Sequence, residues 1–131
     1  MIGLDTNVIV RYLTQDDPVQ SPKATELIEH RLTVETPGFV SIVAMAETVW
    51  VLDRTFNQSP REIAATIERM LQIEVLLIEH EQEVFTAMIA LKEGRASFAD
   101  ALIAALGIRA GCKYTLTFDQ KALRMTGFQQ A

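Results

Sequence analysis

The chain has 131 residues, of which 49% are hydrophobic and 22% charged, a composition typical of one compact globular domain and not of a disordered protein. Its 12 basic and 17 acidic side chains give a formal net charge of −5, which argues against a protein that holds nucleic acid mainly through a basic surface. No apolar run approaches the roughly 18 residues of a membrane span, and a lone Cys112 cannot form an internal disulfide. We therefore expect a cytoplasmic protein without a membrane segment, with Cys112 as a small buried apolar residue.

Strands alternate with helices in the predicted element order. We expect strands at residues 1–4, 38–40, 75–78 and 114–117, and helices at residues 7–14, 19–33, 42–54, 60–72, 80–94, 97–109 and 120–125. The helix that begins at Pro60 is the most strongly marked, because Ser59 and Glu62 have the spacing of a capping box. This alternation predicts one α/β domain over residues 1–131, built on a parallel sheet.

Two acidic residues follow predicted strands. Asp5 comes directly after the first strand and Asp119 just after the strand at 114–117. The carboxyl ends of parallel strands meet at one edge of a sheet, where α/β proteins bind their ligands. Each residue also has a purely structural interpretation, since Asp5 can cap the helix that follows and Asp119 can sit in a turn.

Two further acidic residues stand in apolar helices. Glu47 has only Val43, Trp50 and Val51 as neighbours one turn away, so we expect it on an apolar stripe that packs against the sheet. Asp100 is the only charged residue in the segment 98–106. The structural interpretations are that Glu47 reaches water from the helix edge, and that Asp100 completes a capping box opened by Ser97.

Four carboxylates that converge on one edge would repel one another unless a cation joins them. Hard oxygen ligands without His or Cys favour Mg²⁺ or Mn²⁺. Such a cluster commonly serves metal-assisted phosphoryl transfer.

The segments that contain these acids resemble the PIN-domain ribonucleases, and most closely the VapC-type toxins of bacterial toxin–antitoxin pairs. The resemblance covers essentially the whole length. It is carried by Gly3-Leu4-Asp5-Thr6-Asn7-Val8, by Ser41 to Trp50 with Ala46-Glu47, by Phe98-Ala99-Asp100-Ala101-Leu102-Ile103-Ala104, and by Thr115-Leu116-Thr117-Phe118-Asp119. Each motif is weak alone, and the ordered set is specific.

The resemblance implies a three-layer α/β/α fold with a small central parallel sheet. It implies that Asp5, Glu47, Asp100 and Asp119 are the catalytic acids and bind one or two Mg²⁺ or Mn²⁺ ions, with Asp119 the most variable of the four. Thr6, Asn7 and Thr117 match polar positions that support such a site. The implied activity is endoribonuclease hydrolysis of RNA by a toxin that inhibits translation, and the implied partners are a cognate antitoxin and a second copy of the chain.

Two other functions stay open. An aspartyl phosphohydrolase would use Asp5 as its nucleophile, but position 7 is Asn where that chemistry favours a second acid. A non-enzymatic, receiver-like metal-binding module would need only one or two of the acids. Met45, Trp50 and Phe98 are predicted to be core residues and not platforms for bases.

The charge is unevenly distributed along the chain. Residues 1–91 hold 6 basic and 14 acidic side chains (−8), whereas residues 92–131 hold 6 and 3 (+3). The net charge of −5 is thus compatible with an RNA substrate, provided that cations neutralise the acids. Candidate RNA contacts, which are also ordinary surface charges, are Arg11, Lys92, Arg95, Lys121 and Arg124.

Overall fold

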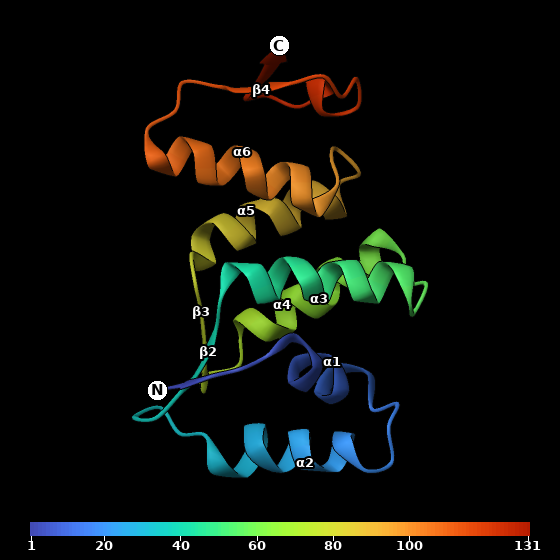
Figure 1. Ribbon diagram of the computed structural model, residues 1–131, viewed down its shortest axis with the longest axis vertical. Helices are drawn as coiled ribbons and strands as arrows, with labels where there is room; N and C mark the ends of the chain where they lie inside the picture. The colour runs from blue at the N-terminus through green and yellow to red at the C-terminus, as the bar shows by residue number, and fades with distance from the viewer. The chain divides into compact units, whose positions relative to one another are not determined.

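The computed structural model describes residues 1–131 and divides into two compact units, Met1–His80 and Glu81–Ala131 (Figure 1). Each unit combines helices with a small parallel sheet; the parallel pairing was predicted, but within one sheet. None of the helices is long and apolar enough to cross a membrane. That one domain spans residues 1–131 remains a prediction.

The N-terminal unit is built on three parallel strands in the order β1-β2-β3. They are β1 (Ile2–Gly3), β2 (Gly38–Val40) and β3 (Leu76–Ile78), with β2 between the other two. The helices are α1 (Thr6–Thr14), α2 (Gln20–Glu26), which continues as the π-helical turn Leu27–Arg31, α3 (Ile42–Arg54) and α4 (Pro60–Leu71). Helix α1 packs against α2 and α3, so the segment that follows β1 lies beside α3 (Figure 1).

The core of this unit consists of side chains from the sheet and from one face of each helix. Fully buried examples are Ile9, Val40, Met45, Leu52, Ile67 and Met70. The predicted bounds of α3, residues 42–54, are confirmed. The Ser41 hydroxyl caps the start of this helix by accepting a hydrogen bond from Ala44 N.

The C-terminal unit contains α5 (Glu81–Lys92), α6 (Phe98–Ala110), β4 (Thr115–Thr117) and β5 (Phe128–Gln130). Helices α5 and α6 pack on each other (Figure 1). Their buried side chains include Val84, Met88, Phe98 and Ala101. Strands β4 and β5 pair in parallel, linked by a 3-10 turn at Ala122–Arg124 where a short helix was predicted.

Three local predictions were wrong. Strand β5 was missed, because Phe128-Gln129-Gln130 has neither an apolar run nor alternation. Cys112 is exposed, because α6 ends at Ala110 with Gly111 as its cap and Cys112 lies in the segment that follows. Trp50 is 60% exposed on α3, whereas Met45 and Phe98 are buried as predicted.

The capping box at the start of α4 offers a test of pH dependence. Ser59 Oγ accepts from Glu62 N at 3.1 Å, and Glu62 Oε1 accepts from Ser59 N at 3.0 Å. These hydrogen bonds lower the pKa of Glu62, so their contribution is present above its ordinary pKa and is lost as pH falls through the lowered value. Glu62→Gln keeps the box without a titrating group. It should therefore lose less stability than the wild type between pH 7 and pH 3, measured by urea unfolding. A Ser59→Ala variant should instead lose about 1 kcal/mol at pH 7.

Candidate active site

The segment after β1 brings together two of the four predicted acids. Asp5 caps α1, since its Oδ1 accepts a hydrogen bond from Thr6 N at 2.8 Å. The hydroxyl of Thr6 donates to Glu47 Oε1 on α3 at 2.7 Å. Thr6 itself is buried and links the two carboxylates. The structure therefore places Asp5 and Glu47 on either side of Thr6, although Glu47 lies 41 residues after Thr6 in the sequence.

The free lone pairs of this acid pair face no protein cation. Asp5 and Glu47 each engage only one carboxylate oxygen in a hydrogen bond. Neither forms an ion pair, because the N-terminal unit's only ion pairs join Arg11 to Asp16 and Arg54 to Asp53. Two uncompensated carboxylates with one free oxygen each are a donor set that suits a hard divalent cation.

Glu47 lies on a face of α3 that the sequence did not predict correctly. Its neighbours Val43 and Trp50 are apolar, as predicted, but they are 67% and 60% exposed, and Glu47 is exposed with them. The buried face of α3 is instead formed by Ala44, Met45, Thr48 and Leu52. The predicted packing of the Glu47 stripe against a sheet is therefore wrong, and the interpretation in which Glu47 reaches water is correct.

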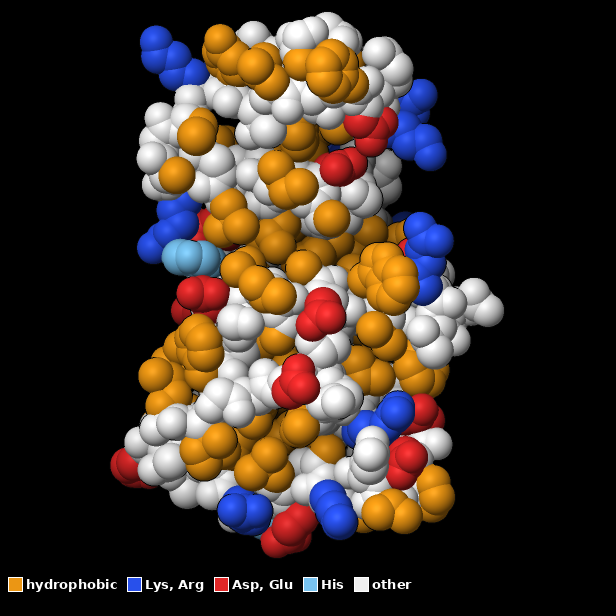
Figure 2. Space-filling view, viewed as in Figure 1, with side chains coloured by type: hydrophobic (Ala, Val, Ile, Leu, Met, Phe, Trp, Pro, Cys, Tyr) orange, Lys and Arg blue, Asp and Glu red, His pale blue; other side chains and the backbone are white.

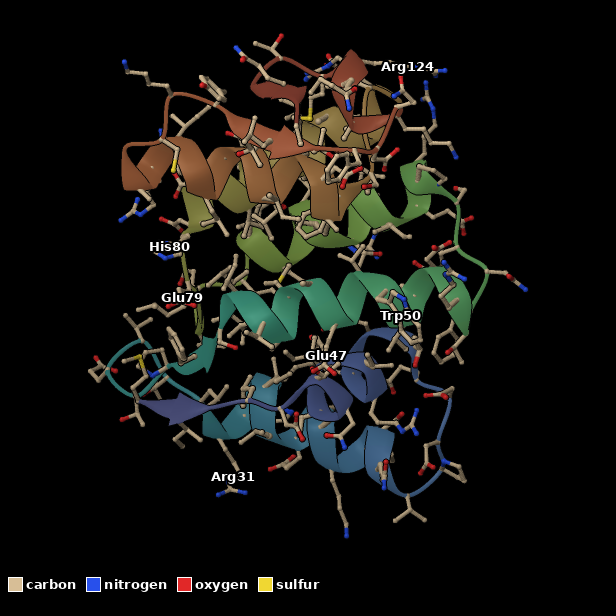
Figure 3. All side chains as sticks on the ribbon, turned by 45° about the horizontal axis from the view of Figure 1, so that its top comes forward. Arg31, Glu47, Trp50, Glu79, His80 and Arg124 are labelled. Carbon is tan, nitrogen blue, oxygen red and sulfur yellow. The ribbon has the colours of Figure 1, made fainter.

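The helix that carries Glu47 is held at its start by a residue that sequence reasoning missed. Glu79 Oε1 accepts a hydrogen bond from Ile42 N at 2.8 Å, while Glu79 N donates to Val40 O at 2.9 Å. Glu79 thus ties the end of β3 to the turn between β2 and α3 (Figure 3). An acid directly after a buried parallel strand was the available signal, because neighbouring parallel strands end at the same edge.

Asp100 lies in the first turn of α6. Ser97 Oγ accepts from Asp100 N at 3.1 Å, which confirms Ser97 as the cap. The return bond of a capping box, from Ser97 N to the Asp100 carboxylate, is not made, in contrast with Ser59 and Glu62. The carboxylate of Asp100 is therefore not used for capping and is half-buried at the helix start.

Asp119 occupies a turn after β4. Its Oδ1 accepts from Lys121 N at 2.9 Å, and its own N–H donates to Thr117 Oγ1 at 3.0 Å. The turn interpretation is thus correct as far as it goes, and the second carboxylate oxygen is free. Of the predicted supporting residues, Thr6 and Thr117 each hydrogen-bond at a predicted acid, whereas Asn7 is exposed without such a bond.

The four acids are divided evenly between the two units, with Asp5 and Glu47 in one and Asp100 and Asp119 in the other. Neither unit by itself gathers three or more His, Cys, Asp or Glu side chains into a group that could hold a metal ion. Among the candidate RNA contacts, Arg11 is paired with Asp16 and Arg95 with Glu93. Lys92, Lys121 and Arg124 are exposed and form no ion pair.

Asp5 follows β1 of a parallel sheet, at the edge where α/β proteins bind their ligands, and Thr6 joins it to Glu47 on α3. The chain belongs to the PIN domain family, whose pattern matches residues 2–127. PIN domains have a three-layer α/β/α fold, which confirms the predicted fold class, and they are generally metal-dependent nucleases that act on RNA. A search of curated proteins found no match.

Proposed function

We propose that this PIN-domain protein is an Mg²⁺- or Mn²⁺-dependent endoribonuclease and the VapC-type toxin of a toxin–antitoxin pair that inhibits translation. The observation that carries the proposal is the Asp5–Thr6–Glu47 connection, in which two carboxylates without protein cations share one buried threonine. A receiver-like module or a phosphohydrolase based on Asp5 alone gives no role to Glu47.

In this proposal Asp5, Glu47, Asp100 and Asp119 hold the cation. A bound divalent cation would supply a water of lowered pKa and would neutralise charge on the phosphodiester. The backbone N–H of Thr6 orients Asp5, and the Thr6 hydroxyl orients Glu47, so each carboxylate presents its second oxygen in a fixed direction. Glu79 acts as a positioning residue through α3.

The partners follow from the same proposal. A toxin of this kind is neutralised by a cognate antitoxin, and we expect a segment of that antitoxin to place a basic side chain against the acids. We also expect a homodimer and a cytoplasmic location. Expression of the chain alone should arrest growth, and co-expression of a small protein encoded beside it should restore growth.

The decisive experiment is cleavage of structured RNA by the purified chain with and without divalent cations. We expect cleavage in Mg²⁺ or Mn²⁺, loss of cleavage in EDTA, and recovery when excess Mg²⁺ is returned, because the carboxylates alone provide no charge that stabilises the transition state. The length of the products, read on a denaturing gel, distinguishes cuts within the chain from trimming at its ends. Cleavage at the same rate in EDTA, or none in any cation, would contradict the proposal.

A further inference from the structure

The exposed face of α3 has an unusual composition. Val43, Glu47, Trp50 and Arg54 follow one another at spacings of four, three and four residues and therefore form one stripe along the helix. Val43 is 67% and Trp50 60% exposed, and the Arg54 side chain is 69% exposed. Figure 2 shows that hydrophobic side chains are also exposed elsewhere on the visible face of the molecule. Burying the indole of Trp50 against a partner would remove a large apolar surface from water, so its exposure suggests a binding surface.

Trp50 is fixed close to the proposed acid pair. Residues three apart on a helix have Cβ atoms about 5–6 Å apart, so the indole begins one turn from Glu47 (Figure 3). Glu47 is in turn bound to Thr6, beside Asp5. Because one helix carries both Glu47 and Trp50, this spacing does not depend on any loop.

Arg54 supplies a cation one turn beyond Trp50. Its only carboxylate neighbour is Asp53 at 3.7 Å, and both side chains are more than half exposed. Such an exposed pair is weak, so the guanidinium is available to a phosphate. The stripe thus presents, in order, a carboxylate for a metal, an aromatic plane and a weakly paired cation.

We propose that Trp50 is a stacking platform for an unpaired base of RNA next to the cleaved phosphodiester, with Arg54 contacting a phosphate beyond that base. This assignment of Trp50 and Arg54 rests on the proposed function. Stacking of a base on an aromatic side chain tolerates any base, so the platform positions the strand without reading its sequence. The antitoxin expected above would bring a basic side chain to Glu47, so it would compete with RNA for this stripe.

The test uses the fact that Trp50 is the only tryptophan of the chain. Single-stranded RNA of mixed sequence is titrated into the full chain with Ca²⁺ in place of Mg²⁺, so that a cation neutralises the acids. A gel checks that the RNA stays intact, and the tryptophan emission is recorded. We expect saturable quenching, and weaker quenching by the same sequence in a perfect duplex. Trp50→Ala should weaken binding about tenfold to a hundredfold by fluorescence anisotropy of labelled RNA, and Trp50→Phe should weaken it less.

Phe85→Ala is the matched control, because Phe85 is also an exposed aromatic residue on a helix, at 48%, but lies on α5. It should bind RNA as the wild type does, and Arg54→Gln should bind more weakly. Equal affinity of Trp50→Ala and wild type would overturn the proposal. The proposal would also be overturned if the tryptophan emission shifted with protein concentration alone and Trp50→Ala lost the dimer. The stripe would then be an interface between copies of the chain.

The outcomes also separate this inference from the proposed function. Quenching and a loss of affinity in Trp50→Ala, without cleavage of any RNA in Mg²⁺, would support the RNA surface and contradict the nuclease. Metal-dependent cleavage that Trp50→Ala leaves unchanged, with unchanged binding, would support the nuclease and overturn the stacking platform.

Discussion

Replacing Asp5 by Asn is expected to lower the rate of metal-dependent RNA cleavage by about a thousandfold, which corresponds to roughly 4 kcal/mol of lost transition-state stabilisation. Asn is as good a helix cap as Asp, so its side-chain oxygen can still accept from Thr6 N and α1 should form normally. The substitution thus removes the negative charge and leaves the local structure. Initial rates at saturating Mg²⁺, with urea unfolding on the same samples, separate the two effects.

Asp17→Asn is the matched control for this prediction. Asp17 accepts hydrogen bonds from Val19 N and Gln20 N at the start of α2, which is the same local chemistry as at Asp5, and it has no contact with Glu47. This variant should cleave RNA at the wild-type rate. If Asp5→Asn and Glu47→Gln both keep wild-type rates, the four-acid site is wrong.

Thr6→Val separates orientation from ligation within the same pair. Valine keeps the volume of threonine but removes the hydroxyl that donates to Glu47 Oε1. Both carboxylates stay in place, so the loss should be smaller than in Asp5→Asn, about tenfold to a hundredfold, as for other partners of metal ligands. It should be accompanied by weaker activation at low Mg²⁺.

Features set by neighbouring residues were predictable from the sequence. The starts of α3 and α4 follow from serine caps, and the end of α6 follows from Gly111, which adopts φ +99°. Asp5 was predictable as a candidate metal ligand for the same reason, because its place directly after a strand can be recognised from the neighbouring residues alone.

Features set by distant segments were not predictable. Periodicity places Glu47 among Val43 and Trp50, but only packing decides which side of an almost wholly apolar helix is buried, and here it is the side with Met45 and Leu52. The hydrogen bond from Thr6 to Glu47 and that from Ile42 N to Glu79 likewise join segments 41 and 37 residues apart. No local pattern specifies such pairs.

Three of the four acids share one feature that the sequence did not reveal. In Asp5, Glu47 and Asp119, one carboxylate oxygen accepts a hydrogen bond from the protein while the other is free. For Asp5 and Asp119 the donor is a backbone N–H one or two residues later, so the structural role and the proposed chemical role use different oxygens. A capping or turn interpretation of these residues therefore does not compete with metal binding.

The second large effect is expected at Gly38 in β2, the central strand of the N-terminal sheet. A Cβ atom there would lie 2.8 Å from Cδ1 of both Leu4 and Leu32 and 3.2 Å from Cγ of Leu4. Both leucines are buried, at 7% and 4% exposure, so neither can swing aside freely. Gly38→Ala should therefore lower the free energy of unfolding by about 1–3 kcal/mol, the usual cost of overpacking, measured by urea unfolding.

Gly3→Ala is the control for Gly38→Ala, because Gly3 lies in the adjacent strand β1 and a Cβ there meets nothing within 4 Å. It should be as stable as the wild type. The Gly38 substitution should also reduce cleavage beyond what its unfolded fraction explains. The N–H of Leu4 donates a hydrogen bond to Phe39 O in β2, and Leu4 directly precedes Asp5. If the new methyl group pushes Leu4 away from β2, the carboxylate of Asp5 moves with it. A shift of about 1 Å in a catalytic group can cost a hundredfold in rate. Full activity in a destabilised Gly38→Ala variant would show that the position of Asp5 is set by its cap on α1 and not by the sheet.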